Sequence, residues 1–562
     1  MTASAQSLAL EASQLAQQGD DSGADMLFER ALAALPQDAR LANSAGNFHF
    51  KAGRLARALV LFERALALAP NLVEAGINAA IALGRLGQAG RAATLLAPLE
   101  PYAHANAGYW RVRADSLRQA GRFHDASLAM ATAVALDPAN PRTARSRARL
   151  SLERHDPDAI GHLEQALTAN RGDPNLLFDY AQALAIGGRM DEALECTSTL
   201  VTQVPGWTDG LKLHAELRWA AGERARFADH FETVAAMAGA PPAVYLAWAE
   251  TLDGVDRPEE SAAILERARR IWPDDPALAL AEAISLGEAG MADKAQAVLG
   301  SFASLTAPEW ATARGRNLLR LGDPLAAEAQ LAGVLALHPR DVVAWALTDL
   351  CWRLRGDERH TWLHGQPGLV RQIALPLTDD ERAQITALLG GLHRHSAMPI
   401  GQSVKQGSQT KGALFARTEP ELARLEQALR DAMAEYRAGL PAPDARHPLL
   451  SRRDAAWDIT GSWSIRLEGQ GHHAAHIHPR GVLSSASYWL VPDEVDAPGG
   501  PGWLELGNPP PGLAEGLGPL HAIRPLEGTL ALFPSTLFHG TRPIHRGTRM
   551  TVAFDITAEN EA

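Results

Sequence analysis

A proline recurs every 34 residues in the first part of this chain. The similar segments FERALAALPQDA and FERALALAPNLVE place Pro36 and Pro70 one such period apart, and two further periods lead to Pro138 in MATAVALDPAN. Proline cannot continue a helical hydrogen-bond ladder, so each of these residues is expected to end a helix. The period predicts one helical hairpin per unit, and hairpins of this kind stack because none can bury its apolar face alone.

The positions inside each period are typical of the tetratricopeptide repeat. The first two periods place small or aromatic residues where the two helices of a hairpin must approach, at Ala24, Phe28, Ala31, Gly46, Ala58, Phe62 and Ala65. Later periods are less regular but keep an alanine and a proline, at Ala193 and Pro205, Ala268 and Pro273, and Ala327 and Pro339. Residues 207–241 are irregular and still expected to be helical. The sequence predicts roughly ten repeats between about residues 5 and 365.

Such an array presents a concave surface that suits a peptide or protein partner. The alternative is that the array only supports dimerisation or shields the next domain. The sequence alone names no residue of the groove, and it leaves the oligomeric state open.

Length and composition set further limits. A chain of 562 residues is too long for one core, and its net charge of −12 does not favour a nucleic-acid partner. Cys196 and Cys351 lie in no motif, so neither a disulfide framework nor a CxxC metal site is expected. The first residues do not resemble a signal peptide, and no apolar run is long enough to span a membrane. We therefore expect a cytoplasmic protein.

The character of the sequence changes near residue 366. Two helical stretches remain, DDERAQITALLGGLHR and EPELARLEQALRDAMAEYRAGL, but short alternating segments dominate after about residue 455. Among these are GSWSIRLEG, AAHIHPRG, LSSASYWLVP, GWLELGN, GTLALFPS and RMTVAFDI. Short strands separated by turns predict a sandwich or a barrel. We predict two regions, a repeat array at residues 1–365 and a β-domain at residues 366–562.

Histidine is concentrated toward the end of the chain, because residues 360–562 hold 12 of the 20 histidines. His476 and His478 stand two residues apart on a predicted strand, so both side chains point to the same side. A third histidine, His539, follows the apolar run GTLALFP, and Arg549 comes ten residues later on another predicted strand. The pattern predicts a metal site built on strands.

This constellation resembles the double-stranded β-helix oxygenases that use Fe(II) and 2-oxoglutarate. Those enzymes place His-x-Asp/Glu on one strand, a distal histidine some way downstream, and an arginine or lysine about ten residues after it. The resemblance implies a jelly-roll, cupin-like domain with flanking helices after an all-α tetratricopeptide superhelix. It also implies that Arg549 binds the distal carboxylate of 2-oxoglutarate, a bidentate geometry that suits guanidinium, with Thr551 as a second contact.

The segments PIGQSVKQGSQTKG, HIHPRGVLSSASYWL and GTLALFPSTLFHGTRP are similar to a narrower bacterial and phage group of 2-oxoglutarate/Fe(II) oxygenases, often fused to tetratricopeptide arrays. The layout also resembles aspartyl/asparaginyl β-hydroxylases and some prolyl hydroxylases, which act on peptide or protein side chains. The resemblance covers about residues 370–562.

One position departs from the family pattern. The usual triad of two histidines and one carboxylate requires an acid at position 478, where this chain has histidine. His478 is then the third metal ligand of a three-histidine site, or it lies next to a site completed by water, or the domain has lost its activity. Three-histidine iron sites are better known in dioxygenases that do not use 2-oxoglutarate.

Other residues near these motifs are weaker candidates. His472 and His473 are expected in a turn, and His521 and His545 in loops, as solvated histidines or as supports for the ligands. Gln402 and Gln409 are candidates for a substrate-side loop through the resemblance. Tyr488 and Trp489 fit a core as well as a pocket wall. No GxSxG, P-loop, HExxH or Rossmann fingerprint is present.

The sequence thus favours a non-haem iron dioxygenase that couples 2-oxoglutarate decarboxylation to hydroxylation of a peptide or protein side chain. The expected ligands are His476, His478 and His539, with Arg549 and Thr551 at the cosubstrate; a small-molecule substrate stays open. Two alternatives remain. One is a repeat scaffold with a degenerate metal-binding domain, and the other is a three-histidine oxygenase that does not use 2-oxoglutarate or that uses another metal such as copper.

Overall fold

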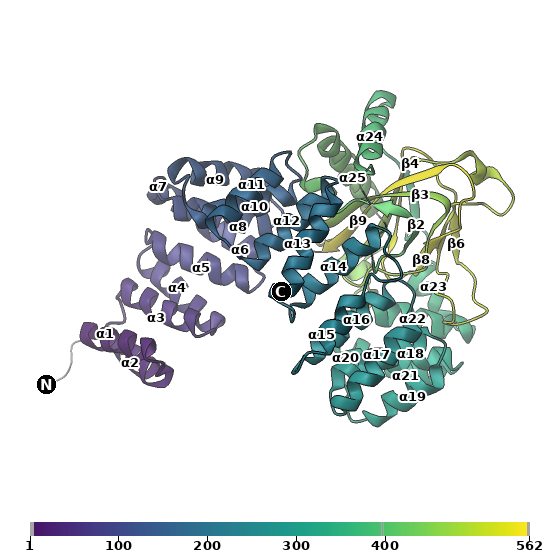
Figure 1. Ribbon diagram of the computed structural model, residues 1–562. Helices are drawn as coiled ribbons and strands as arrows, with labels where there is room; N and C mark the ends of the chain where they lie inside the picture. The colour runs from purple at the N-terminus through teal and green to yellow at the C-terminus, as the bar shows by residue number, and fades with distance from the viewer. Residues whose placement is uncertain (1–4, 395, 397, 399, 559–562) are drawn as a thin grey trace. The chain divides into compact units, whose positions relative to one another are not determined.

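The structure is a computed structural model that describes residues 5–394, 396, 398 and 400–558. Two compact units divide it, residues 1–176 and residues 177–562, and each is described by itself. The first is entirely helical, whereas the second contains the remaining repeat helices and all the strands (Figure 1). Among the described residues, no helix combines the length and the apolar character that a membrane span requires.

Helical hairpins run from the start of the described chain to residue 364. In the first unit the helices are α1 Ala5–Gln17, α2 Asp21–Ala34, α3 Ala39–Lys51, α4 Leu55–Leu68, α5 Val73–Arg85, α6 Ala89–Leu96 (extended by η1 Ala97–Leu99 and α7 Glu100–Ala103), α8 Ala107–Gln119, α9 Phe123–Leu136, α10 Pro141–Glu153 and α11 Ala159–Ala169. Helix α12, Pro174–Ile186, begins at the end of this unit and continues into the second.

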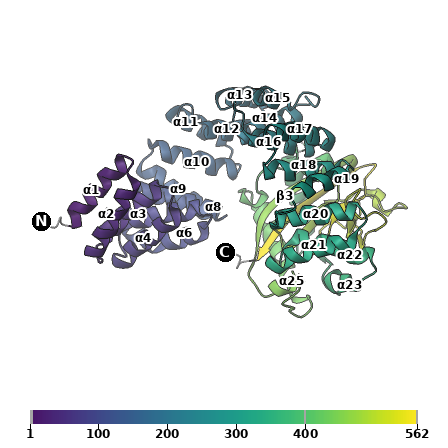
Figure 2. The same ribbon diagram turned by 90° about the horizontal axis from the view of Figure 1, so that it is seen from below.

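The second unit continues the hairpins. Its helices are α13 Met190–Gln203, α14 Thr208–Ala220, α15 Asp229–Ala235, α16 Pro242–Asp253, α17 Pro258–Ile271, α18 Pro276–Glu288, α19 Ala292–Ser301, α20 Pro308–Arg320, α21 Pro324–Leu337, α22 Val342–Leu354 and α23 Arg359–His364. Figures 1 and 2 both show α20, α21 and α22 packed side by side. The segment 207–241, irregular in sequence, is helical except for the turns between α14, α15 and α16.

The recurring prolines end helices as the sequence predicts. Helices α2, α4 and α9 each stop two residues before the proline of their period, and α13, α17 and α21 do the same. The residue before a proline is disfavoured in helical conformation, which fixes the end of each hairpin. The turn inside the hairpin also repeats, because Gly53, Gly87 and Gly121 all have positive φ angles.

The remaining elements form the β-domain and its helices. They are β1 Arg371–Ala374, α24 Asp379–Leu392, β2 Val404–Gln409, η2 Leu414–Ala416, α25 Pro420–Ala438, η3 Leu450–Arg452, β3 Trp457–His473, β4 Leu483–Leu490, η4 Asp493–Asp496, β5 Leu504–Leu506, β6 His521–Ile523, β7 Thr529–Pro534, β8 His539–Thr541 and β9 Thr548–Ala558. Helix α24 begins with a capping box in which Thr378 and Glu381 each bond to the other's backbone amide.

The strands form two antiparallel sheets. The larger has the order β1-β7-β4-β9-β3-β2, and the smaller has the order β6-β5-β8. Helices α24 and α25 cover one face of the larger sheet and share its main apolar core (Figure 1). Tyr488 and Phe533 project from the other face and pack with Leu504 and Leu506 of the smaller sheet. The predicted order, an all-α repeat array followed by a β-domain with flanking helices, is confirmed, and the two sheets are compatible with a double-stranded β-helix.

Strand β9 separates core from cavity by its alternation. Met550, Val552, Phe554 and Ile556 are buried in the core under α24 and α25. The residues between them, Arg549, Thr551, Ala553 and Asp555, line a cavity on the other face of the sheet. Successive strand residues point to opposite faces, so a single strand provides both the packing surface and the cavity wall.

The last repeats of the second unit share side chains with the β-domain. Leu513, Ala514 and Phe538 lie in one apolar cluster with residues of α21 and α22. The Nε2 atom of buried His364 lies 2.9 Å from the Thr536 hydroxyl, and His447 donates to the carbonyl of Leu363 at 2.9 Å. The two compact units therefore meet at residue 176, inside the repeats. The boundary between repeat array and β-domain at residue 365 stays a prediction.

Candidate metal centre

A cavity of about 700 Å³ opens between the two sheets and the turn that joins α16 to α17. It contains all five residues that the sequence predicts for the site, which are His476, His478, His539, Arg549 and Thr551. The repeat array contributes Asp253, Gly254 and Asp256 to the wall. The Gly401 amide donates to the Gly254 carbonyl at 3.0 Å, and Lys405 pairs with Asp256 at 2.5 Å. These contacts hold the loop before β2 against the repeats.

The backbone sets two of the histidines face to face. His476 and His539 exchange both main-chain hydrogen bonds, each 2.9 Å long, as an isolated antiparallel bridge. Residues paired in this way project their side chains to the same side. The ring centroids of His476 and His539 are 4.2 Å apart, and the His478 ring is 5.1 Å from each of the other two.

Each of the three rings has its Nδ1 atom beside an oxygen. Nδ1 lies 2.8 Å from the Ala474 carbonyl in His476 and 3.1 Å from the Leu537 carbonyl in His539. In His478 the partner is the Asp555 carboxylate, at 2.5 Å. An oxygen acceptor at Nδ1 requires the proton there, so the lone pair of the neutral ring lies on Nε2. The three ligand nitrogens lie within 4.8 Å of one another.

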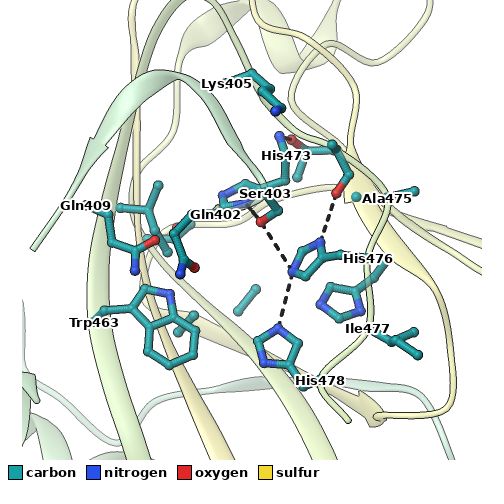
Figure 3. A pocket seen from close by; sticks show the side chains of 18 of the residues that line it. Gln402, Ser403, Lys405, Gln409, Trp463, His473, Ala475, His476, Ile477 and His478 are labelled. Carbon is teal, nitrogen blue, oxygen red and sulfur yellow. Dashed lines mark hydrogen bonds between the residues drawn. The ribbon is translucent and has the colours of Figure 1, made fainter. Parts of the chain in front are cut away.

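The donor set fits a transition-metal ion. The Nε2 atoms of His476 and His478 are 3.2 Å apart (Figure 3). Because each ring carries its proton on Nδ1, no proton lies between these two nitrogens. Burial is the main factor that lowers the pKa of His476 to about 4, and it also lowers the pKa of His539 well below its usual value. Neutral imidazole is the form that binds metals, and Fe, Cu, Ni and Zn all accept it. The three histidines therefore could hold a metal ion.

Asp555 is a site residue that the sequence reasoning missed. Its carboxylate is about a quarter exposed, and it contacts His478 on the side away from the other two histidines. The Trp463 ring is parallel to the His478 ring, with an angle of 3° between the ring planes and 5.8 Å between the ring centroids. A carboxylate behind a ligating histidine fixes the ring and makes it a better donor. The sequence could have indicated Asp555, because alternate residues of a strand share a face and Asp555 is an even number of positions from Arg549 and Thr551.

Arg549 is a buried cation without a counter-ion. Its side chain is 1% exposed, its Nε atom has no hydrogen-bond partner, and it forms no ion pair within the described part of the chain. The guanidinium carbon lies 5.3 Å from the ring centroid of Tyr488, a neutral neighbour. Burial lowers the pKa of Arg549. Buried charges are normally paired, so this arginine fits an anionic ligand in the cavity, and Thr551 lies one strand position further along the same wall.

Two local expectations differ from the structure. The segment AAHIHPRG, expected as a strand, has only the bridge residue His476 in ladder geometry and continues as turns. His472 and His473, expected in a turn, instead end β3. His473 lines the cavity, and its Nδ1 is 3.1 Å from the Ser403 hydroxyl, which also lies 3.3 Å from Nε2 of His476 (Figure 3). Ser403 was not among the sequence candidates.

The other candidates are also placed. His521 lies in the short strand β6, whereas His545 is in a loop as expected. Tyr488 contacts Arg549, but Trp489 belongs to the core under the helices. Gln402 and Gln409 line the cavity on the side of Trp463 (Figure 3).

Comparison with known proteins finds a matching family in each of the two regions. Residues 461–555 match the family described as "Putative 2OG-Fe(II) oxygenase", and residues 49–115 and 157–217 match the tetratricopeptide repeat. A search of curated proteins found no significant match to the chain.

Two of the solved structures to which parts of the chain are similar are tetratricopeptide repeat proteins. One is a tetratricopeptide repeat protein from Parabacteroides merdae, with 17% identity and a TM-score of 0.37, covering 43% of this chain and 97% of that protein. Another is a thermophilic repeat protein of Thermus thermophilus, with 25% identity and a TM-score of 0.27, covering 32% of this chain and 99% of that protein. The chain thus contains segments that match the tetratricopeptide repeat and a segment that matches the family described as "Putative 2OG-Fe(II) oxygenase".

Proposed function

We propose that this protein is an Fe(II)- and 2-oxoglutarate-dependent dioxygenase that hydroxylates a side chain of a peptide or protein. His476, His478 and His539 would hold the iron, Arg549 would bind the distal carboxylate of 2-oxoglutarate, and the Thr551 hydroxyl would be a second contact. Bound iron with 2-oxoglutarate and oxygen would supply the oxidising chemistry, in which the cosubstrate becomes succinate and CO2 and a C–H bond becomes C–OH.

One observation carries this proposal. A single cavity contains three histidines with Nε2 available as a ligand and a buried arginine without a counter-ion. A degenerate scaffold needs neither feature, because an unpaired buried cation lowers stability. A three-histidine oxygenase that does not use 2-oxoglutarate would need the histidines but not the arginine. The family match agrees with the combination of both.

The contact between His478 and Asp555 supports His478 as the third ligand. A histidine that only occupied space beside a water-completed site would not need its Nδ1 held by a carboxylate. Asp555 also returns one negative charge to a site that has lost the usual carboxylate ligand, although through an intervening imidazole. The role of this chain's residues would thus be to orient the ligands and to bind the cosubstrate.

The test is to load the purified full chain with Fe(II) without oxygen and to titrate 2-oxoglutarate. We expect a visible metal-to-ligand absorption band, and 2-oxoglutarate-dependent succinate once oxygen is admitted. Iron binding without either signal would favour the oxygenase that does not use 2-oxoglutarate. If no metal binds at the histidines, the protein is a scaffold and the proposal is wrong.

A further inference from the structure

A second cavity, of about 410 Å³, adjoins the histidine cavity. Gln402, Gln409 and Trp463 line both cavities, so these three side chains form the boundary between them. Figure 3 shows the three gathered on one side of His476 and His478. A ligand in the second cavity would therefore reach the candidate metal centre directly past these residues.

Repeat helices form the far wall of this second cavity. Phe178 and Gln182 of α12 are four residues apart, which places them on one face of the helix. Four residues of α14 with spacings of three, one and three also share a face, and they are Asp209, Lys212, Leu213 and Glu216. The near wall is the end of β2 with Thr410 and Lys411, and Trp463 of β3. Repeat surface and β-domain thus enclose one site within the second unit.

The polar lining includes three amide side chains without partners among the described residues. The side chains of Gln182, Gln402 and Gln409 form no hydrogen bond with any residue that the structure describes. A glutamine amide has an N–H donor and a C=O acceptor, so it can bond to both the C=O and the N–H of a peptide unit. Three such amides around one cavity suit a ligand with repeated donors and acceptors rather than a single charged group.

The charged groups of the cavity are largely matched already. Lys411 pairs with Glu216 at 2.8 Å, and Lys212 pairs with Glu250 at 3.2 Å. Both lysines of the lining are therefore neutralised, and Asp209 adds a negative charge. Phosphate-bearing ligands require unpaired cations, so this lining does not fit a nucleic acid or a phosphorylated segment.

We propose that the second cavity binds the main chain of an extended polypeptide, with its peptide units bonded to Gln182, Gln402 and Gln409. The side chain to be oxidised then passes Trp463 into the histidine cavity. This inference rests on the proposed function for the fate of that side chain, but the binding itself does not need the metal. Polypeptide is favoured because successive peptide units present a donor and an acceptor at each step along an extended chain.

The test measures binding to the metal-free full chain, so activity is not needed. The probe is a fluorescein-labelled degenerate octapeptide library, compared with the same library carrying N-methylated peptide bonds, which lack the N–H donor. The variants are Gln402→Met combined with Gln409→Met, and separately Gln182→Met. Gln384→Met, on an exposed position of α24 outside both cavities, is the matched control.

We expect the plain library to bind and the N-methylated library to bind weakly. The double variant should lose at least about tenfold in affinity, since each removed hydrogen bond is worth up to about a factor of ten, while Gln384→Met should not change it. Thermal melts check that every variant is folded. Equal binding of both libraries, or unchanged affinity in both the double variant and Gln182→Met, would overturn the inference.

Two further arms separate the possible failures. Binding of a neutral oligosaccharide in place of the library would show that the occupant is not a polypeptide, and would also overturn the inference. The anaerobic iron and 2-oxoglutarate titration is run beside the library assay on the same wild-type chain. A normal absorption band without library binding removes only the inference, whereas library binding without the band removes only the proposed function.

Discussion

At the scale of single residues, the histidine at position 478 is the main departure from the family pattern. The oxygenase family that the sequence resembles has an acid at this position. In this structure the acid is Asp555, which lies behind His478 and contacts its Nδ1 atom. The carboxylate contacts Nδ1 rather than the shared point between the three Nε2 atoms. Its charge would then act on the metal through the imidazole, as in other sites where a carboxylate orients a ligating histidine.

We expect Asp555→Asn to weaken Co(II) or Fe(II) binding by about 10- to 100-fold, the usual cost of losing such an outer partner. The amide keeps the size of the side chain but has no charge. Competition with a chromophoric chelator measures the affinity, and Asp493→Asn, at an exposed position in η4, is the control. Unchanged affinity in Asp555→Asn would mean that His478 does not depend on this carboxylate.

Arg549 gives the second prediction at this scale. We expect Arg549→Met to weaken 2-oxoglutarate binding by about 2–5 kcal/mol because a buried charge-assisted pair is lost. Metal affinity should stay as in the wild type, and the melting temperature should not fall, because methionine removes an unpaired buried charge. The measurements are the absorption titration and a thermal melt. The exposed neighbour Arg546, changed to Met, is the control. Loss of the metal in Arg549→Met would show that our role for Arg549 is wrong.

At the scale of elements, His447 connects the end of the repeats to the β-domain. Its Nε2 donates to the Leu363 carbonyl of α23, and its Nδ1 accepts from the amides of Leu449 and Leu450 beside η3. Only the neutral ring can do both, because protonation puts a hydrogen on Nδ1 against two N–H donors. Burial is the main cause that lowers the pKa of His447 to about 4.

This pKa predicts loss of stability on the acid side. A histidine with a lowered folded-state pKa contributes its full stability above about pH 6.5, the unfolded value, and loses it as the pH falls toward 4. The shift corresponds to at most about 3 kcal/mol for this fully buried ring. We expect His447→Asn to melt lower at pH 7 but to lose less between pH 7 and pH 5 than the wild type. Melting temperatures across this range test it, with exposed His338→Asn as control; equal slopes would contradict it.

At the scale of the whole chain, the second unit shows repeats and β-domain as one packed body. Arg353 of α22 donates to the carbonyls of Gly507 and Gly518, each at 2.5 Å, and His364 connects Asp349 to Thr536. The turn between α16 and α17 has Asp256 at a positive-φ position that is glycine in repeats such as those of Gly53, Gly87 and Gly121, and its carboxylate pairs with Lys405. A residue strained in this way suggests a purpose beyond the turn itself.

We therefore expect residues 366–562 expressed alone to aggregate or to melt without cooperativity. Removing the repeats exposes Leu513, Ala514 and Phe538, which are 2–3% exposed in the whole chain, and leaves His447 without its acceptor. A fragment of residues 174–562, which begins with the whole of α12, should fold and bind metal. Solubility, thermal melts and Co(II) titration of the two fragments check this. A cooperative fold for residues 366–562 would instead support independent domains divided at residue 365.

Some features follow from the sequence because they depend on local chemistry. The period of 34 residues gives the hairpins, since a proline ends a helix wherever it stands and small residues allow close helix approach. The i and i+2 spacing of His476 and His478 puts both on one side even though the segment is not a regular strand. The resemblance to the oxygenases, which rests in part on the ten-residue step from His539 to Arg549, implies a cation near the histidines, and all of these residues line one cavity.

Other features were decided only by the tertiary structure. The lack of a counter-ion for Arg549 and the contact between Asp555 and His478 both depend on segments that are far apart in sequence. In the second cavity, Gln402 and Gln409 lie beside residues of α12 and α14 that are more than 180 positions away in the sequence. Local propensity cannot encode such contacts, because they arise where surfaces from distant parts of the chain pack together and exclude water.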